Sequence, residues 1–146
     1  MVQPITYAPL LITLHASGAE TTTAGTNGTA VQIAGVSRMI VLLDASVSAT
    51  EAGDTLNVYV DVSLDNSTWM NAVHFTAQAG NGAAFKEFAV LDPSAPGTAV
   101  VNVTADAAAA AVRPSLFGMW IRARWIVVDT GGAVPSHTFS VVALVM

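Results

Sequence analysis

Three histidines are the side chains best suited to act as a general base near neutral pH or as imidazole metal ligands: His15, His74 and His137. They are far apart in the sequence. None stands in a His-x-His, His-x-x-x-His or His-Glu-x-x-His spacing, which would hold two ligands on one element. Hydrogen bonding within strands and loops is therefore the role that we expect for them.

Carboxylates are concentrated in one stretch, which holds Asp44, Glu51, Asp54, Asp61 and Asp65. Such a group raises two hypotheses, a calcium site and the carboxylate pair of a glycosidase. The Asp-x-Asn-x-Asp spacing with a following Gly and Glu, which marks a calcium loop, is missing. Charge on turn tips and on the wet faces of strands is common without any special purpose.

Motifs for nucleophilic catalysis and phosphate binding are also missing. The sequence holds no Gly-x-Ser-x-Gly or Ser-x-x-Lys pattern, and Lys86 is its single lysine. The glycine-rich stretch at 80–82 lacks the lysine and the following helix of a phosphate loop. We therefore predict that the protein is not an enzyme and has no catalytic residues, no metal ligands and no cofactor.

The segment 120–125 concentrates side chains that suit a protein interface. Alternate residues of a strand share a face, so Trp120, Arg122 and Arg124 are expected to lie together. A tryptophan and two planar guanidinium groups offer much contact area and many hydrogen-bond donors. We take these three residues as candidates for a subunit or capsid interface.

Two other interpretations of the same segment remain open. The arginines of 120–125 would pair with Asp61 or Asp129 across the sheet if the strand simply lies at the surface. Alternatively, Trp120 or Tyr59 would stack on a carbohydrate.

Composition indicates a chain that buries surface against other subunits. The 146 residues are enough for one domain with a substantial core, and 53% of them are hydrophobic while 10% are charged. An average soluble domain has roughly 25% charged residues. Because large exposed apolar patches usually mark interaction sites, we expect part of the surface to be covered by partners.

Charge and hydropathy exclude several classes of partner. A net charge of -5 with five basic residues argues against nucleic acid, which is bound through clustered lysine and arginine. No apolar run approaches the roughly 18 to 20 residues of a membrane-spanning helix, so no membrane partner is predicted. The N-terminal sequence lacks the basic start of a signal peptide, and cysteine is absent, so no disulfide is expected.

Hydrophobic alternation and turn residues predict an all-β fold, a single-domain β-sandwich or jelly roll over residues 10–146. Strands are expected at 10–17, 29–33, 37–47, 56–64, 69–75, 85–90, 98–103, 118–128 and 138–145. The alanine-rich segment 106–113 is the one plausible short helix, because alanine has high helix propensity and Pro114 would end it.

Two of these strands differ in the faces that they present. Residues 56–64 are apolar at every second position, which predicts one face in the core and the other in water. Residues 39–43 are apolar throughout, so neither face of this strand is suited to contact with water. This pattern is typical of a strand covered by the core on one side and by a subunit on the other. Met39 and Val41 are therefore candidate interface residues.

Residues 1–9 are expected to form an extended N-terminal arm. Pro4 and Pro9 bias the residues before them towards β or polyproline conformations. Val2, Ile5 and Tyr7 are the apolar side chains with which such an arm would contact a neighbouring surface. A frayed terminus is the alternative interpretation.

Several segments together resemble the decoration, or cement, proteins of tailed-bacteriophage capsids. The likeness spans most of residues 24 to 144 and is carried by Thr-Asn-Gly-Thr-Ala-Val-Gln-Ile-Ala-Gly at 26–35, Met-Ile-Val-Leu-Leu-Asp at 39–44, and the segments 56–69, 117–125 and 138–141. It implies a sandwich or jelly-roll protomer that forms homotrimers on the outer capsid surface, binds the major capsid protein and stabilises the shell. Such a protein would be made in the host cytoplasm and located in the virion.

The same resemblance leaves other roles open. Related sandwiches occur in phage neck, tail and fibre components, and a glycan-binding sandwich is a further alternative. The resemblance assigns no individual contact residue, although it gives the arm at 1–7 the role of reaching onto a neighbouring subunit or the capsid.

Overall fold

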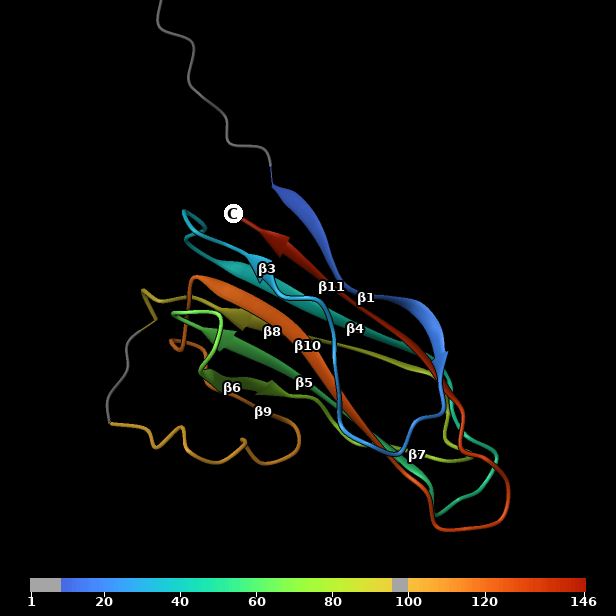
Figure 1. Cartoon of the computed structure of the whole chain (residues 1–146). Helices are drawn as coiled ribbons and strands as arrows, with labels where there is room; N and C mark the ends of the chain where they lie inside the picture. The colour runs from blue at the N-terminus through green and yellow to red at the C-terminus, as the bar shows by residue number, and fades with distance from the viewer. Residues whose placement is uncertain (1–8, 96–99) are drawn as a thin grey trace, which may run out of the picture.

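Two antiparallel β-sheets pack face to face in the computed structural model, which describes residues 9–95 and 100–146 (Figure 1). The first sheet has the order β1 (Leu10–Glu20), β11 (His137–Val145), β4 (Met39–Val47) and β8 (Phe85–Leu91). The second has the order β2 (Thr26–Asn27), β10 (Trp120–Val128), β5 (Thr55–Ser63), β6 (Trp69–His74) and β9 (Ala111–Val112). Two short strands join the second sheet, β3 (Val31–Gln32) beside β10 and β7 (Gln78–Ala79) beside β5.

The strand order is that of a jelly roll. The chain passes from β1 in the first sheet to β2 and β3 in the second, returns for β4, and crosses again for the β5–β6 hairpin. It then visits β8 in the first sheet and β10 in the second before β11 inserts between β1 and β4. Apart from the β5–β6 hairpin and the steps that involve a short strand, consecutive strands therefore lie in opposite sheets, as in the double-sheet jelly rolls. The predicted all-β sandwich is therefore confirmed.

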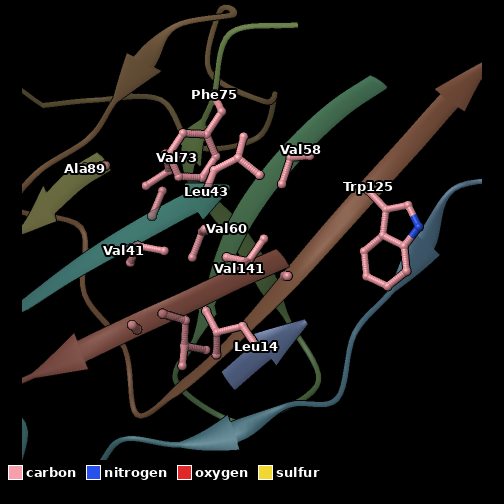
Figure 2. Close-up of a cluster of buried hydrophobic side chains, with 14 of the residues drawn as sticks. Leu14, Val41, Leu43, Val58, Val60, Val73, Phe75, Ala89, Trp125 and Val141 are labelled. Atoms are coloured by element: carbon pink, nitrogen blue, oxygen red, sulfur yellow. The ribbon is translucent and has the colours of Figure 1, made fainter. Parts of the chain in front are cut away.

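The core lies between the two sheets and follows from strict alternation along the long strands. Except at the last residues of β4 and β10, every second side chain of β4, β10 and β11 is buried and its neighbours are partly exposed. Branched and aromatic residues fill the space, because they pack well on a pleated surface. Figure 2 shows this cluster, which includes Leu14, Val41, Leu43, Val58, Val60, Val73, Phe75, Ala89, Trp125 and Val141.

The β4 strand corrects one part of the predicted interface. Met39 and Val41 lie in the core and have no exposed surface to offer a partner. Because side chains alternate across a strand, Ile40 and Leu42 are the apolar residues of β4 on the outer face of the sheet. The strand is apolar on both faces, as predicted, but the two residues assigned to a partner, Met39 and Val41, lie on its inner face.

The β5 strand contradicts the prediction of a wet outer face. Leu56, Val58, Val60 and Val62 face the core as expected, but the residues between them from Tyr59 to Ser63 are buried as well. A segment at 105–113 and side chains of β10 cover them. Leu64, which was predicted to end the apolar face, is exposed beyond the strand.

The predicted helix at 106–113 and the predicted strand at 98–103 were wrong for the residues that can be compared. The structure contains no helix in the residues that it describes, and 100–103 form no strand. An isolated helix of two turns has little stability, so tertiary contacts decide its conformation. Here Ala110 adopts a left-handed conformation with a φ of 60°, and Ala111 pairs with His74 as part of β9.

The N-terminal arm falls almost wholly outside the described residues. Val2, Ile5 and Tyr7 belong to the segment 1–8, and their role in contacts stays a prediction. Within the described ranges, no helix has the length and apolar character needed to cross a membrane.

Candidate functional site

Two surfaces of the sandwich are candidates for a functional role, and the first is the outer face of β5 and β10. Asp61 of β5 and Arg122 of β10 are register partners, and Arg124 is two residues further along β10. The Nε of Arg124 lies 2.8 Å from Oδ2 of Asp61, and the Nη2 of Arg122 lies 3.6 Å from the same oxygen. Arg124 also contacts Asp106, with Nη2 2.7 Å from Oδ1.

Aromatic rings extend this charged cluster along the same face. The guanidinium of Arg122 lies 4.1 Å from the ring centre of Trp69, and that of Arg124 lies 4.0 Å from the ring centre of Tyr59. The ring of Tyr59 in turn stacks on His74 at 4.2 Å. A cation over an aromatic face is attracted to the ring electrostatically, so each arginine is held by an aromatic ring as well as by Asp61.

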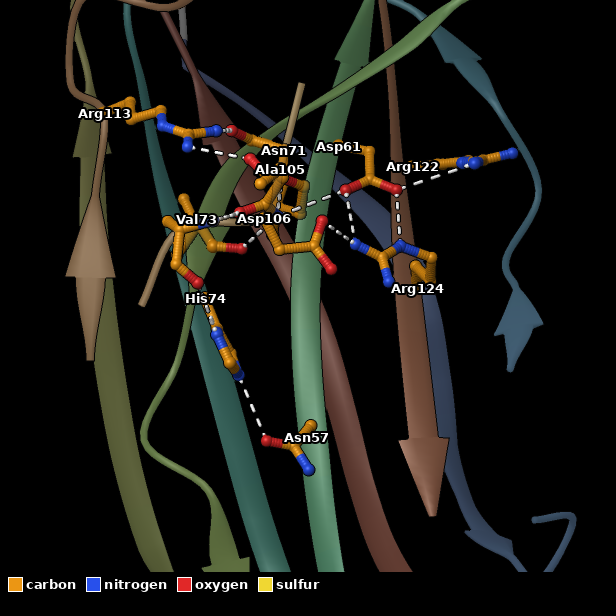
Figure 3. Close-up of polar contacts among 12 residues, drawn as sticks. Asn57, Asp61, Asn71, Val73, His74, Ala105, Asp106, Arg113, Arg122 and Arg124 are labelled. Atoms are coloured by element: carbon orange, nitrogen blue, oxygen red, sulfur yellow. Dashed lines mark hydrogen bonds and ion pairs between the residues drawn. The ribbon is translucent and has the colours of Figure 1, made fainter. Parts of the chain in front are cut away.

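Hydrogen bonds tie a loop segment to this cluster, and Figure 3 shows these contacts. The side-chain oxygen of Asn71 accepts a hydrogen bond from the backbone N–H of Ala107 at 2.9 Å, while its Nδ2 donates to the carbonyl of Val73 at 2.8 Å. Arg113 donates to the carbonyl oxygens of Asn71 and Ala105. These contacts hold the segment 105–113 over β6 and β5.

Arg124 donates to both oxygens of Asp61 and to Asp106. Arg122 forms an ion pair with Asp61 alone, and its buried Nε has no hydrogen-bond partner among the described residues. Each guanidinium side chain keeps 18% of its surface exposed. The alternative that the arginines pair with Asp61 across the sheet is confirmed. A contact of Trp120, Arg122 and Arg124 with a partner stays a prediction, and the free surface available for it is small.

The three histidines occupy structural positions. The Nδ1 of His74 lies 2.9 Å from the carbonyl of Ala107 and its Nε2 lies 3.1 Å from the side-chain amide of Asn57, so neither ring nitrogen contacts Asp61 or Asp44. The other two belong to the first sheet.

His15 is enclosed by aromatic rings. Its ring centre lies 4.3 Å from that of Trp125 and 4.4 Å from that of Phe139. Burial lowers the pKa of His15, and the charge of Glu20 opposes that shift without cancelling it. His137 is buried in the same sheet, where burial again lowers the pKa and the charge of Asp54 opposes it.

The second surface is the outer face of the β1-β11-β4-β8 sheet, which is apolar across all four strands. Register places two rows of side chains next to each other on this face: Leu11, Leu144, Ile40 and Val90 in one, and Thr13, Val142, Leu42 and Phe88 in the other. We call these eight residues the apolar face. The row beyond it is polar and holds Ser140, Asp44 and Lys86, whose Nζ lies 2.9 Å from an oxygen of Asp44.

The exposure of the apolar face is greatest at the two edges of the sheet. Phe88 on β8 is 70% exposed and Leu11 on β1 is 62% exposed, whereas Ile40 and Leu42 in the middle are partly covered by their neighbours. Sequence reasoning found one strand of this face, β4, through its lack of polar residues. The 138–145 segment carried the same signal in Val142 and Leu144.

Comparisons with known proteins identify the fold. No family model matches the chain, and the search of curated proteins found no match. Among solved structures, the infectious bursal disease virus VP2 subviral particle superposes with a TM-score of 0.50 at 12% identity, over 95% of this chain and 32% of that one. The structure of the infectious bursal disease virus Gx strain matches with a TM-score of 0.47 at 11% identity, over 100% of this chain and 36% of that one.

The chain thus spans about a third of the length of the viral proteins that it matches. At this level of identity the likeness concerns the fold, and it agrees with the jelly-roll strand order described above. The described part of the chain therefore has a β-sandwich fold similar to part of the VP2 chain in that subviral particle.

Proposed function

We propose that this protein is a non-enzymatic virion structural protein that decorates the outer surface of a tailed-phage capsid as a homotrimer, binds the major capsid protein and stabilises the shell. The observation that carries the proposal is the apolar face. A sheet that exposes leucine, isoleucine, valine and phenylalanine over two adjacent rows is typical of a surface that another protein covers.

The rest of the molecule supports an architectural role. Asp61 and Asp106 hold Arg124 within the protomer, and His74 is bonded to a backbone carbonyl and an amide rather than to a carboxylate. Such side chains rigidify the second sheet and leave the first sheet as the surface for contact. The capsid-protein fold supports the proposal at the level of architecture, because jelly rolls are common in viral shells.

The proposal assigns different contacts to the first sheet and to the N-terminal arm. Ile40, Leu42 and Phe88 replace Met39 and Val41 as the interface residues of the first sheet. Residues 1–7, with Val2, Ile5 and Tyr7, are proposed to attach to a neighbouring subunit or to the capsid. Deleting 1–7 is therefore expected to weaken capsid attachment more than it lowers the free energy of unfolding, and equal losses in both would refute this part.

Two measurements test the proposal as a whole. Light scattering on a size-exclusion column is expected to give three times the 15.0 kDa of a protomer. Electron microscopy of virions with labelled protein is expected to place the label on the head. A strictly monomeric protein that fails to bind capsids would refute the proposal, and a label on the neck, tail or fibres would favour the alternative of a tail module.

A further inference from the structure

Three carboxylates meet where the loops β4–β5 and β10–β11 lie against each other, at the end of the sandwich where β7 is found (Figure 1). Asp54 directly precedes β5 and Asp129 directly follows β10. Because Thr55 pairs with Val128, the two aspartates occupy the next positions along the paired strands. Glu51 joins them from the β4–β5 loop, and one oxygen of each carboxylate lies within 4.8 Å of the other two.

This arrangement concentrates negative charge, and no lysine or arginine of the described residues neutralises it. Like charges directly opposite each other in a sheet are destabilising. No ion pair joins the three carboxylates to a basic side chain among the described residues. All five basic side chains have their contacts elsewhere: Arg38, Lys86, Arg113, Arg122 and Arg124.

The β10–β11 loop fixes one oxygen of each carboxylate. Thr130 donates its backbone N–H and its hydroxyl to Oδ1 of Asp54, at 2.9 and 3.0 Å. The N–H of Gly131 donates to Oδ1 of Asp129 at 2.7 Å, and that of Ala133 donates to Oε2 of Glu51 at 2.7 Å. The three side chains are thereby held in place by the backbone of a single loop.

A separate observation indicates that a ligand completes the site. Asp54 is 1% exposed, yet its second oxygen, Oδ2, is buried and has no hydrogen-bond donor among the described residues. A buried carboxylate oxygen without a donor costs substantial free energy unless a cation compensates it. Asp54 is the most deeply buried of the three carboxylates, and water does not reach its unpartnered oxygen.

We propose that Glu51, Asp54 and Asp129 bind a calcium ion. Carboxylate oxygens are hard ligands, and calcium accepts six to eight oxygens in flexible geometry, with carboxylates binding through one or both oxygens. Magnesium demands near-octahedral geometry and keeps its waters, which suits this irregular meeting of two loops less well. The ion would clamp the β4–β5 loop to the β10–β11 loop, and so tie the two sheets together at this end.

Thermal unfolding of the chelator-treated protein with added CaCl₂ tests the site. We expect the melting temperature to rise with calcium concentration and to be higher by about 5–10 °C at a hundredfold excess over Kd. Magnesium at the same concentration is expected to produce a smaller rise. A protein whose melting temperature does not respond to 10 mM calcium, or responds equally to NaCl of the same ionic strength, would overturn the proposal.

Two variants assign the effect to these residues. Asp129→Asn removes an exposed ligand. Without calcium this variant is expected to be at least as stable as the parent, because repulsion among the carboxylates is relieved. Most of the calcium-dependent rise in its melting temperature should be lost. Asp54→Asn should lose the rise as well. Asp44→Asn makes the same chemical change at a carboxylate paired with Lys86 and should keep it. A full calcium response in Asp129→Asn would contradict the assignment.

Discussion

Asp61 of β5 and Arg124 of β10 form an ion pair across the sheet, with Nε 2.8 Å from Oδ2, on the face of β5 turned away from the core. Asp61 is 3% exposed and serves Arg122 as well. The pair therefore builds a second, polar layer on the outside of the second sheet. That layer leaves the first sheet as the one with a broad apolar outer face.

Replacing the shared carboxylate should destabilise the protomer strongly. Asp61→Asn leaves two mostly buried arginines without their common counter-ion, and breaking a buried pair in this way costs about 3 kcal/mol or more of unfolding free energy. Urea unfolding measures the loss. The exposed pair of Asp44 with Lys86 gives the control, because Asp44→Asn should cost less than about 1 kcal/mol. Equal and small losses in the two variants would show that the cluster is not structural.

The attachment of the segment 105–113 to β6 should depend on Asn71. Its amide accepts from Ala107 and donates to Val73 inside the protein, so Asn71→Ala leaves buried partners unpaired and should cost about 1–3 kcal/mol. We also expect faster proteolysis within 105–113. Asn102→Ala removes an exposed amide that bonds Thr104 nearby and serves as the control. Unchanged proteolysis in Asn71→Ala would contradict this role.

Self-association should be sensitive to Phe88. Phe88→Ser removes an exposed ring, so the free energy of unfolding should change by less than about 0.5 kcal/mol. If the ring is a central contact, the variant should lose about 2 kcal/mol of association free energy, which is roughly a 30-fold weaker Kd. Val134→Ser changes a side chain that is 74% exposed but lies outside the apolar face, and should associate normally. Sedimentation equilibrium compares the two, and equal association would exclude Phe88.

Stability should fall as the pH falls below about 6.5. The folded-state pKa values of His15 and His137 are lowered by burial, so between pH 6.5 and the folded pKa the unfolded chain binds more protons than the folded one. Each histidine contributes a slope of at most about 1.4 kcal/mol per pH unit in that window. His15→Phe keeps an aromatic ring beside Trp125 and Phe139 and should reduce the slope between pH 6.5 and 5. An unchanged slope would show that His15 does not contribute.

The long strands could be predicted from the sequence because the signal for them is local. Alternation of apolar residues within 56–64 and 138–145 sets which side chains face the core, and turn residues set where the strands end. The doubly apolar segment at 39–43 likewise pointed to a covered outer face. Which of its residues face outward depends on the register with β8 and β11, and this was assigned wrongly.

The polar layer and the carboxylate cluster could not be predicted, because both depend on pairs that are distant in sequence. Asp61 meets Arg124 only through the β5–β10 register, and Ala107 meets Asn71 only because the segment 105–113 crosses β6. That segment looked helical from its alanines, whereas hydrogen bonds from another strand determine its conformation. Glu51 and Asp54 were noticed as possible calcium ligands, but Asp129 joins them through the fold alone.

Binding to capsids tests the central claim most directly. Expanded capsids of the virus that encodes the protein, prepared without it, are mixed with the parent protein, Phe88→Ser or Val134→Ser and sedimented. The account predicts saturable binding of the parent and of Val134→Ser, with binding by Phe88→Ser weakened at least 30-fold. Absence of binding by the folded parent, or equal binding by all three proteins, would contradict it.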